Sequence, residues 1–389
     1  MTDLHACVDF LQRLIQTPSL PGEEGAIAQL VMTEMDKLGY DEVFSDEAGN
    51  VIGCIRGNGD AQPVMLNTHL DHVDVGEHNA WPHPPFGAEI HDDRIWGRGA
   101  VDIKGPLAAQ VYGAARLKSK GLTPPGDVYV SGVVYEEIGG LGARHLATHL
   151  PPMLIVIGEP SNNELRRGHR GRLELQLHVK GKSVHASRPR IGVNPLEVVS
   201  KFILLLGGLE MAEDVDLGRS TVVPTLLKTD QISSNVVPGE VWLTLDWRNV
   251  PNESEEEVIE KLNRLAQQCL IPGASASVYI PTEERVCYTD FSMEIPACSN
   301  AFVTRSNDEI LLTAENILAD TFGTKPPVDL WRFATDGGHF IRAGAQCIGF
   351  APGDDKLAHT VDEHIPISQI DQALDGYEAL AREWGLKNS

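Results

Sequence analysis

Two patterns of hydrophobic residues alternate along this 389-residue chain. Apolar residues recur at helical spacing, as on one buried face, over residues 4–15, 24–38, 107–117, 308–321 and 367–384. Short, mainly apolar runs, typical of strands buried on both faces, lie at 64–66, 128–135, 154–157 and 346–350. Helices that alternate with buried strands indicate an α/β domain with a parallel or mixed sheet.

The central part of the chain follows another pattern. Apolar and polar residues alternate strictly over 173–179, as in a strand with one face in water. Helices and strands then follow in the order βαββαβ, and the second helix begins at a capping box on Ser254. This order is the ferredoxin-like arrangement. We therefore predict an inserted α+β domain at 170–285, with 1–169 and 286–389 forming the other domain.

Composition excludes several classes of function. The formal charge of −23 argues against binding to nucleic acids and to anionic membranes, which need basic patches. The sequence contains no run of 18 apolar residues, and its first residues do not resemble a secretion signal. Its six cysteines are scattered without a paired motif. We expect a cytoplasmic protein that neither spans nor binds a membrane.

Polar residues that can bind metals follow three of the predicted strands. His69 and Asp71 follow the run 64–66, Glu136 and Glu137 end the run 128–135, and Glu159 follows the run 154–157. Ligands of α/β sheets gather at the strand ends. The sequence therefore predicts one site made from all three ends.

The donor types point to a pair of metal ions. The candidates are His69, Asp71, Asp102, Glu136, Glu137, Glu159 and His359. Two neighbouring zinc ions need a bridging carboxylate plus one histidine and one carboxylate each, which leaves two acids over. One of these can orient a histidine, and the other can act as general base on a water that the metals activate. We interpret the nearby polar residues as solvated loop residues: His72, Asp74, His78, His83, His91, Asp92, Asp93, His339 and His364.

These residues resemble the co-catalytic metallo-aminoacylases and carboxypeptidases, a family that includes acetylornithine deacetylase, succinyl-diaminopimelate desuccinylase and glutamate carboxypeptidase. The resemblance spans nearly the whole chain. Its motifs are His69-Leu70-Asp71, the run from Trp96 to Gly105, Glu136-Glu137, Gly158-Glu159-Pro160, the run from Gly181 to Ser187, and His359. The resemblance implies a mixed-sheet, zinc-exopeptidase-like catalytic domain and an inserted lid domain through which subunits dimerise.

The resemblance also implies a ligand set for two Zn²⁺ ions per subunit, which Co²⁺ or Mn²⁺ can replace. His69 and Glu159 would hold one ion. Glu137 and His359 would hold the other, and Asp102 would bridge the two.

Further roles follow from the same resemblance. Asp71 would orient His69, and Glu136 would be the general base and proton shuttle. His185 is similar to a lid histidine that, in dimeric members, enters the partner's active site and stabilises the oxyanion. We therefore expect a homodimer. Asn235 is similar to a lid residue that holds the substrate carbonyl, although it could instead cap a turn.

The remaining substrate contacts would come from Arg248, Thr335 and Gly337. The planar guanidinium of Arg248 suits a substrate carboxylate, although an ordinary ion pair is the alternative. Thr335 and Gly337 belong to a late loop that resembles the family's substrate-contacting loop. Trp96 and Tyr135 depart from the family pattern beside the site, which bears on specificity.

The expected function is metal-dependent hydrolysis of the amide bond of N-acyl amino acids or short peptides. Glutamate at position 159 favours the deacylase and carboxypeptidase branch over the dipeptidases that have aspartate there. The alternative within the family is a di- or tripeptidase or a carboxypeptidase. A different class of function would be a non-catalytic metal- or ligand-binding protein on the same fold, including one that only buffers cations.

Overall fold

The computed structural model describes residues 3–149 and 153–384, which form two compact units. Unit 1 contains the residues up to 168, together with 284–293 and those from 304 onward. Unit 2 contains 169–283 and 294–303. The sequence prediction ends the inserted segment at 285 and does not include 294–303. That segment belongs to unit 2 because Cys298 and Ser299 pair with the strand that begins at Arg172.

Unit 1 is built on a mixed sheet of eight strands. Strand β3 lies between β6 and β7 and is parallel to both, whereas β1 and β2 are antiparallel to their neighbours. In spatial order the strands are β1 (Glu42–Ser45), β2 (Val51–Ile55), β6 (Val128–Val133), β3 (Val64–His69), β7 (Leu154–Ile157), β23 (Gln346–Phe350), β8 (Leu165–Arg166) and β22 (Val328–Asp329). The predicted α/β class with a mixed sheet is confirmed.

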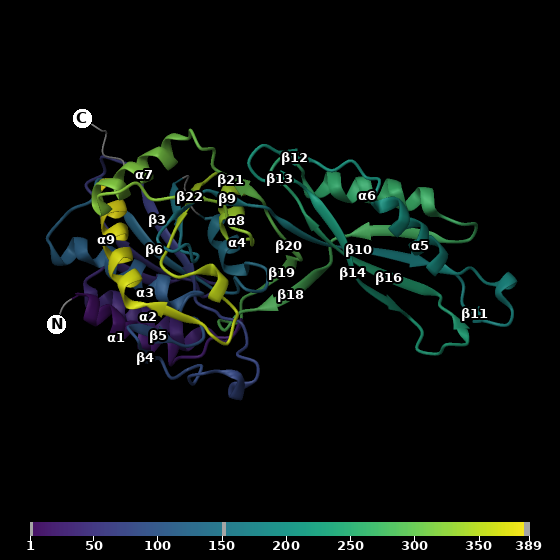
Figure 1. Ribbon diagram of the computed structural model, residues 1–389, viewed down its shortest axis with the longest axis horizontal. Helices are drawn as coiled ribbons and strands as arrows, with labels where there is room; N and C mark the ends of the chain where they lie inside the picture. Colours follow the sequence, from purple (N-terminus) through teal and green to yellow (C-terminus); the bar gives the residue numbers. More distant parts are fainter. Residues whose placement is uncertain (1–2, 150–152, 385–389) are drawn as a thin grey trace. The chain divides into compact units, whose positions relative to one another are not determined.

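Helices pack against this sheet. The almost fully buried helix α3 contacts β3 and β6 and lies along α9, which is yellow in Figure 1. The helices of unit 1 are α1 (Asp3–Ile15), α2 (Gly25–Leu38), α3 (Lys104–Ser119), α4 (Leu141–Ala147), α7 (Glu309–Phe322), α8 (Gly337–Arg342) and α9 (Ile367–Glu383). None of the helices within the described ranges is long and apolar enough to cross a membrane.

A smaller sheet of three strands includes the residues shortly before Asp102. Its order is β24 (His364–Pro366), β5 (Arg94–Trp96) and β4 (Glu89–His91), all antiparallel. Single 3₁₀ turns occur at His78–Ala80 and Asp355–Leu357.

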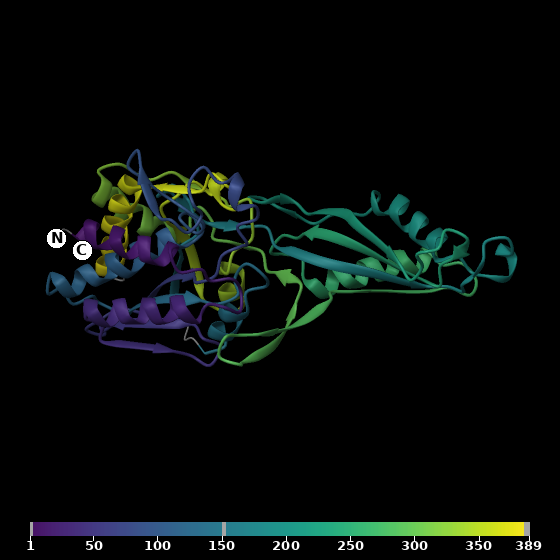
Figure 2. The same cartoon turned by 90° about the horizontal axis from the view of Figure 1, so that it is seen from below.

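Unit 2 is an antiparallel sheet with two helices, α5 and α6, packed on one face. The strand order β14-β16-β10-β17 with βαββαβ connectivity is ferredoxin-like, as predicted. The long strands lie side by side in Figure 2, and the inward residues 173, 175, 177 and 179 form a core with both helices. The elements are β10 (Arg172–Lys180), α5 (Pro195–Leu206), β14 (Thr221–Thr229), β16 (Glu240–Arg248), α6 (Glu255–Cys269), β17 (Ser275–Tyr279) and β20 (Cys298–Ser299).

The remaining strands form two-stranded ladders. They are β9 (Gly168–His169) with β21 (Phe302–Val303), β11 (Val184–His185) with β15 (Val236–Val237), β12 (Glu213–Asp214) with β13 (Gly218–Arg219), and β18 (Thr282–Val286) with β19 (Ser292–Pro296). A 3₁₀ turn covers Pro189–Ile191.

Candidate metal centre

Three neighbouring strands deliver the first group of candidate ligands. His69 is the last residue of β3, and Glu159 follows β7. Glu136 and Glu137 follow β6, after Tyr135 turns the chain with a φ of 59°. Because β6, β3 and β7 are adjacent and parallel, their carboxyl ends meet at one edge of the sheet.

Asp102 lies between two histidines that are far apart in the sequence. Its Oδ1 is 3.1 Å from Nε2 of His69, and its Oδ2 is 3.1 Å from Nε2 of His359. Nε2 of His359 is also 3.0 Å from Oε1 of Glu137, and Nε2 of His69 is 3.6 Å from Oε1 of Glu159. Each carboxylate oxygen of Asp102 thus faces a different imidazole, which is the arrangement that a carboxylate bridging two cations requires.

The charges of this group suit bound cations. Donor atoms of His69, Asp102 and Glu137 lie within 4.8 Å of one another, as do those of His69, Glu136 and Glu159. Burial raises the pKa of Glu136 well above its usual range, and the carboxylate of Glu159 raises it further. Burial also raises the pKa of Glu159, with Asp102 adding to the effect. These crowded acids and two imidazoles form an N/O donor set that fits Zn²⁺, Co²⁺ or Mn²⁺.

Asp71 contacts both the His69 ring and the backbone of Glu136 and Glu137. Nδ1 of His69 is 3.0 Å from the main-chain oxygen of Asp71 and 3.4 Å from its Oδ1. The two carboxylate oxygens of Asp71 also accept hydrogen bonds from the backbone N–H groups of Glu136 and Glu137, each at 3.1 Å. The contact with His69 fits the predicted orienting role. The support of the Glu136–Glu137 turn is a contact that the sequence does not reveal.

Glu363 fixes the backbone that carries Asp102. This fully buried carboxylate accepts hydrogen bonds from the N–H groups of Val101 at 2.9 Å and Asp102 at 3.1 Å, and from Nη1 of Arg98 at 2.5 Å. Sequence reasoning missed Glu363, because nothing local marks an acid whose partners are more than 260 residues away.

Asp336 is a second acid that sequence reasoning missed. Burial raises its pKa to about 7, and its charge interacts with those of His69 and Asp71. It stands between two predicted substrate residues, Thr335 and Gly337, which are both buried. The Thr335 hydroxyl accepts a hydrogen bond at 3.2 Å from the N–H of Gly337, the first residue of α8. Substrate contact by Thr335 and Gly337 stays a prediction.

The other candidate substrate residues belong to unit 2. His185 is exposed in β11, and its Nδ1 accepts a hydrogen bond from the Ser187 N–H at 3.2 Å. Arg248 makes two contacts with the carboxylate of Asp246, at 2.6 and 3.2 Å, so the ion pair given as the alternative is present. The Asn235 side chain accepts a hydrogen bond from the Ser233 hydroxyl at 2.6 Å. The substrate roles of these three residues stay predictions.

The interpretation of the surrounding polar residues as solvated is wrong for two histidines. His72 is buried, and its Nε2 accepts a hydrogen bond from the Ser19 N–H at 2.9 Å. His339 is buried in α8. The His72 ring contacts Ser19 and Phe86, and the His339 ring lies against Gly140. These partners are distant in the sequence or placed by the fold, so local sequence does not reveal them.

Comparisons with known proteins show the family and the fold of this chain. The model of Peptidase family M20/M25/M40 matches residues 65–383. The uncharacterized protein YgeY of Escherichia coli K12 is 28% identical over 384 residues, which cover 96% of this chain and 93% of that protein. Succinyl-diaminopimelate desuccinylase of Dinoroseobacter shibae is 26% identical over 386 residues, which cover 95% and 97%. The M20 family metallo-carboxypeptidase Sso-CP2 of Sulfolobus solfataricus has the same fold, with a TM-score of 0.75 at 20% identity over 100% of both chains.

Proposed function

Since this chain belongs to peptidase family M20/M25/M40 and is a metal-dependent hydrolase of amide or peptide bonds, we propose that it removes the acyl group of small N-acyl amino acids. The arrangement of Asp102 between His69 and His359 carries this proposal. It supports a centre of two cations that share one carboxylate, with a further acid left for proton transfer.

The proposed ligands divide into two sets around Asp102. His69 and Glu159 would hold one ion, and Glu137 and His359 the other. Bound Zn²⁺ lowers the pKa of water and polarises an amide carbonyl. Zn²⁺ is the ion we propose, because the mixed imidazole and carboxylate donors suit it, with Co²⁺ as a replacement.

Glu136 is the proposed general base. Its carboxylate lies within 4.8 Å of donor atoms of His69 and Glu159, and Asp71 holds its backbone N–H. Glu136 would take a proton from the attacking water and pass it to the nitrogen of the leaving amine. Asp71 would hold Glu136 and the His69 ring in position during the transfer.

Variants of the adjacent glutamates separate the two proposed roles. Glu136→Gln should keep both ions but lose about 10²–10⁴-fold in kcat, because proton transfer is lost. Glu137→Gln should lose ions as well as activity, since it removes a ligand. Elemental analysis and initial rates measure the two effects. Wild-type turnover in Glu136→Gln would contradict the assignment of the base.

The substrate class is tested with a panel of N-acetyl and N-succinyl amino acids and dipeptides, with Zn²⁺ or Co²⁺ added. Faster hydrolysis of the acyl amino acids supports the deacylase. Faster hydrolysis of dipeptides would favour the peptidase alternative. Absence of both hydrolysis and bound metal would favour a non-catalytic binding protein.

Unit 2 supplies the proposed oxyanion and substrate contacts. Because the Ser187 N–H donates to Nδ1 of His185, a neutral His185 ring carries its proton on Nε2, which suits it for donating to an oxyanion. We propose that Asn235 contacts the substrate carbonyl. Arg248 would bind the substrate carboxylate while it also pairs with Asp246.

We also propose a homodimer formed through unit 2. Strand β14 is at one end of its sheet and exposes Val223, Leu226 and Leu227 at 54%, 48% and 47%. An apolar sheet edge of this kind favours pairing with another chain. Leu226→Glu should yield monomers in analytical ultracentrifugation, whereas Leu312→Glu, at an exposed apolar residue of unit 1, should not. A monomeric wild type would contradict the proposal.

The cellular setting that we propose is the reducing cytoplasm. All six cysteines are buried and none forms a disulfide. Unpaired thiols are the usual state in that compartment.

A further inference from the structure

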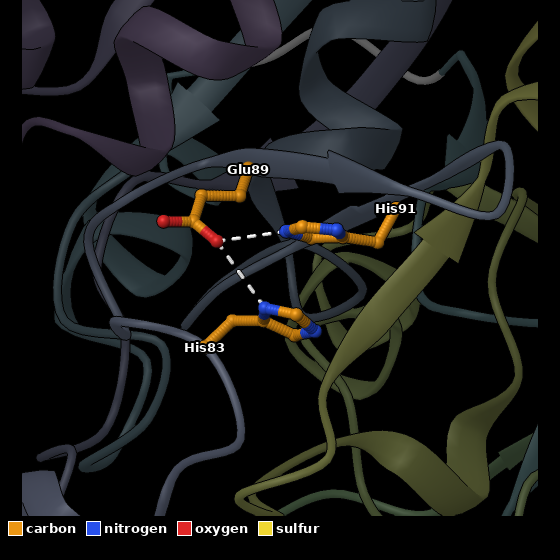
Figure 3. Close-up of side chains that lie close together, drawn as sticks. All are labelled: His83, Glu89 and His91. Atoms are coloured by element: carbon orange, nitrogen blue, oxygen red, sulfur yellow. Dashed lines mark hydrogen bonds and ion pairs between the residues drawn. The ribbon is translucent and has the colours of Figure 1, made fainter.

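A second cluster of metal-binding side chains lies outside the centre described above. Figure 3 shows one ring nitrogen of His83 and one of His91 directed at the same carboxylate oxygen of Glu89. Nδ1 of His83 is 3.2 Å from this oxygen, and Nε2 of His91 is 2.8 Å from it. The three donor atoms lie within 4.8 Å of one another.

The backbone holds two of these side chains on one face. Glu89 and His91 are two residues apart in β4, so both side chains leave the same side of the strand. β4 pairs with β5 in a hairpin, with Glu89 opposite Trp96. The Trp96 ring packs against His83, with 4.8 Å between ring centroids, and so supports the third ligand.

The spacing of the donors suits one small cation. Ligand atoms bound tetrahedrally to Zn²⁺ at about 2.0–2.1 Å lie about 3.3 Å apart. The separations of 3.2 and 2.8 Å between the histidine nitrogens and Oε2 of Glu89 are close to that value. Two imidazoles and a carboxylate also form the ligand set of several zinc sites that keep a fourth position open.

The surroundings also favour a cation. The rings of His83 and His91 stack, with centroids 4.0 Å apart, so both imidazoles face the same small volume beside Glu89. The hairpin turn beside His91 adds two carboxylates, Asp92 and Asp93. The side chains of Glu89 and His91 are 43% and 47% exposed, which leaves the ion a path from solvent.

We propose that His83, Glu89 and His91 bind one divalent transition-metal ion of the Zn²⁺ class, in addition to the ions of the proposed co-catalytic centre. The ion fastens the loop that carries His83 to the β4–β5 hairpin. That loop also accepts a hydrogen bond from the Arg98 N–H, through the carbonyl of Pro85 at 2.8 Å. The third ion therefore has a structural role, because it joins the loop of His83 to the hairpin that precedes Asp102.

The test counts ions as a difference between variants. Full-length protein is stripped with a chelator, dialysed to equilibrium against Zn²⁺, and analysed for bound metal. The variant H83A/H91A should bind one ion fewer per chain than the wild type. His78→Ala is the matched control, since His78 is an exposed histidine of the same loop outside the cluster, and it should bind as many ions as the wild type.

Two further measurements keep the test independent of catalysis and folding. Titration with Co²⁺ should show a visible absorption band from this site in the wild type that is missing in H83A/H91A. Glu89→Gln should weaken the same band while keeping the circular dichroism spectrum of the wild type. Equal ion counts in the wild type and H83A/H91A, or an equal loss in His78→Ala, would overturn the proposal.

Discussion

Replacing Glu363 with glutamine tests whether this acid supports the loop of Asp102. The wild-type carboxylate accepts hydrogen bonds on both oxygens. One oxygen binds Arg98, and the other binds the N–H groups of Val101 and Asp102. Glutamine has the same size but only one acceptor oxygen, so its NH₂ group must face either the guanidinium or the two backbone donors.

Either orientation leaves a buried group without its partner. Glu363 is 0% exposed and Arg98 is 3% exposed, so water does not replace the lost contact. Removing one partner of a buried ion pair costs about 3–5 kcal/mol, because the remaining charge is uncompensated. We therefore expect Glu363→Gln to lower the free energy of unfolding by about 3–5 kcal/mol, a large fraction of the stability of a typical domain.

A second substitution should reverse part of this loss. In Arg98→Met/Glu363→Gln the buried cation is gone, and the amide oxygen of Gln can turn to the N–H groups of Val101 and Asp102. Replacing a buried ion pair by apolar groups is often neutral. The double variant should therefore be more stable than Glu363→Gln alone by about 1 kcal/mol or more, although it carries one more substitution.

Urea unfolding followed by circular dichroism measures these differences. All variants are compared at one Zn²⁺ concentration, because bound ions stabilise the native state by mass action. Glu363→Gln with the wild-type midpoint would refute the assigned role of the buried carboxylate. A double variant that is less stable than Glu363→Gln would refute the explanation through the charge of Arg98.

Two further substitutions test other parts of unit 1. Burial raises the pKa of Glu34, but hydrogen bonds from Tyr112 and Arg13 lower it overall below 4.5, so its contribution to stability is present above that pH and is lost as the pH falls through the folded-state pKa. Glu34→Gln should cost about 1–3 kcal/mol at pH 7 and less at pH 3, measured by urea unfolding at both values. Gly349→Ala would drive a Cβ into the ring of Trp331 and should cost about 1–3 kcal/mol or more in the same assay. Alanine at Gly207, the C-cap glycine of α5 in unit 2, would meet nothing within 4 Å and should be nearly neutral.

Much of the fold could be predicted because the strands and long helices have strong local patterns. The runs at 154–157 and 346–350 match β7 and β23 residue for residue. Helices α4 and α8 were not predicted, since seven and six residues are too few to establish a helical period. The sequence predicts a strand up to residue 135, but β6 ends at Val133. The difference arises because the positive φ of Tyr135 cannot be seen in an apolar run.

The site shows the same division between local and distant causes. The position of His69, Glu136 and Glu159 could be predicted, because parallel strands bring their ends to one edge of the sheet. His359 and Asp102 come from loops, and only the family resemblance pointed to their proximity. The structure places Asp102 at 3.1 Å from both histidines, while the metal and catalytic roles of these residues stay predictions.

Glu363 and Asp336 could not be found from the sequence, because the fold alone brings their partners to them. The same reason applies to one ligand of the proposed third ion. A strand places Glu89 and His91 on one face by its two-residue period, so this half of the cluster is visible in the sequence. The approach of His83 depends on tertiary contacts of its loop, such as the packing of the His83 ring against Trp96, with 4.8 Å between ring centroids. Metal sites in general combine such local pairs with a ligand delivered by the fold. A single histidine on a polar loop therefore carries no signal until the fold shows what it faces.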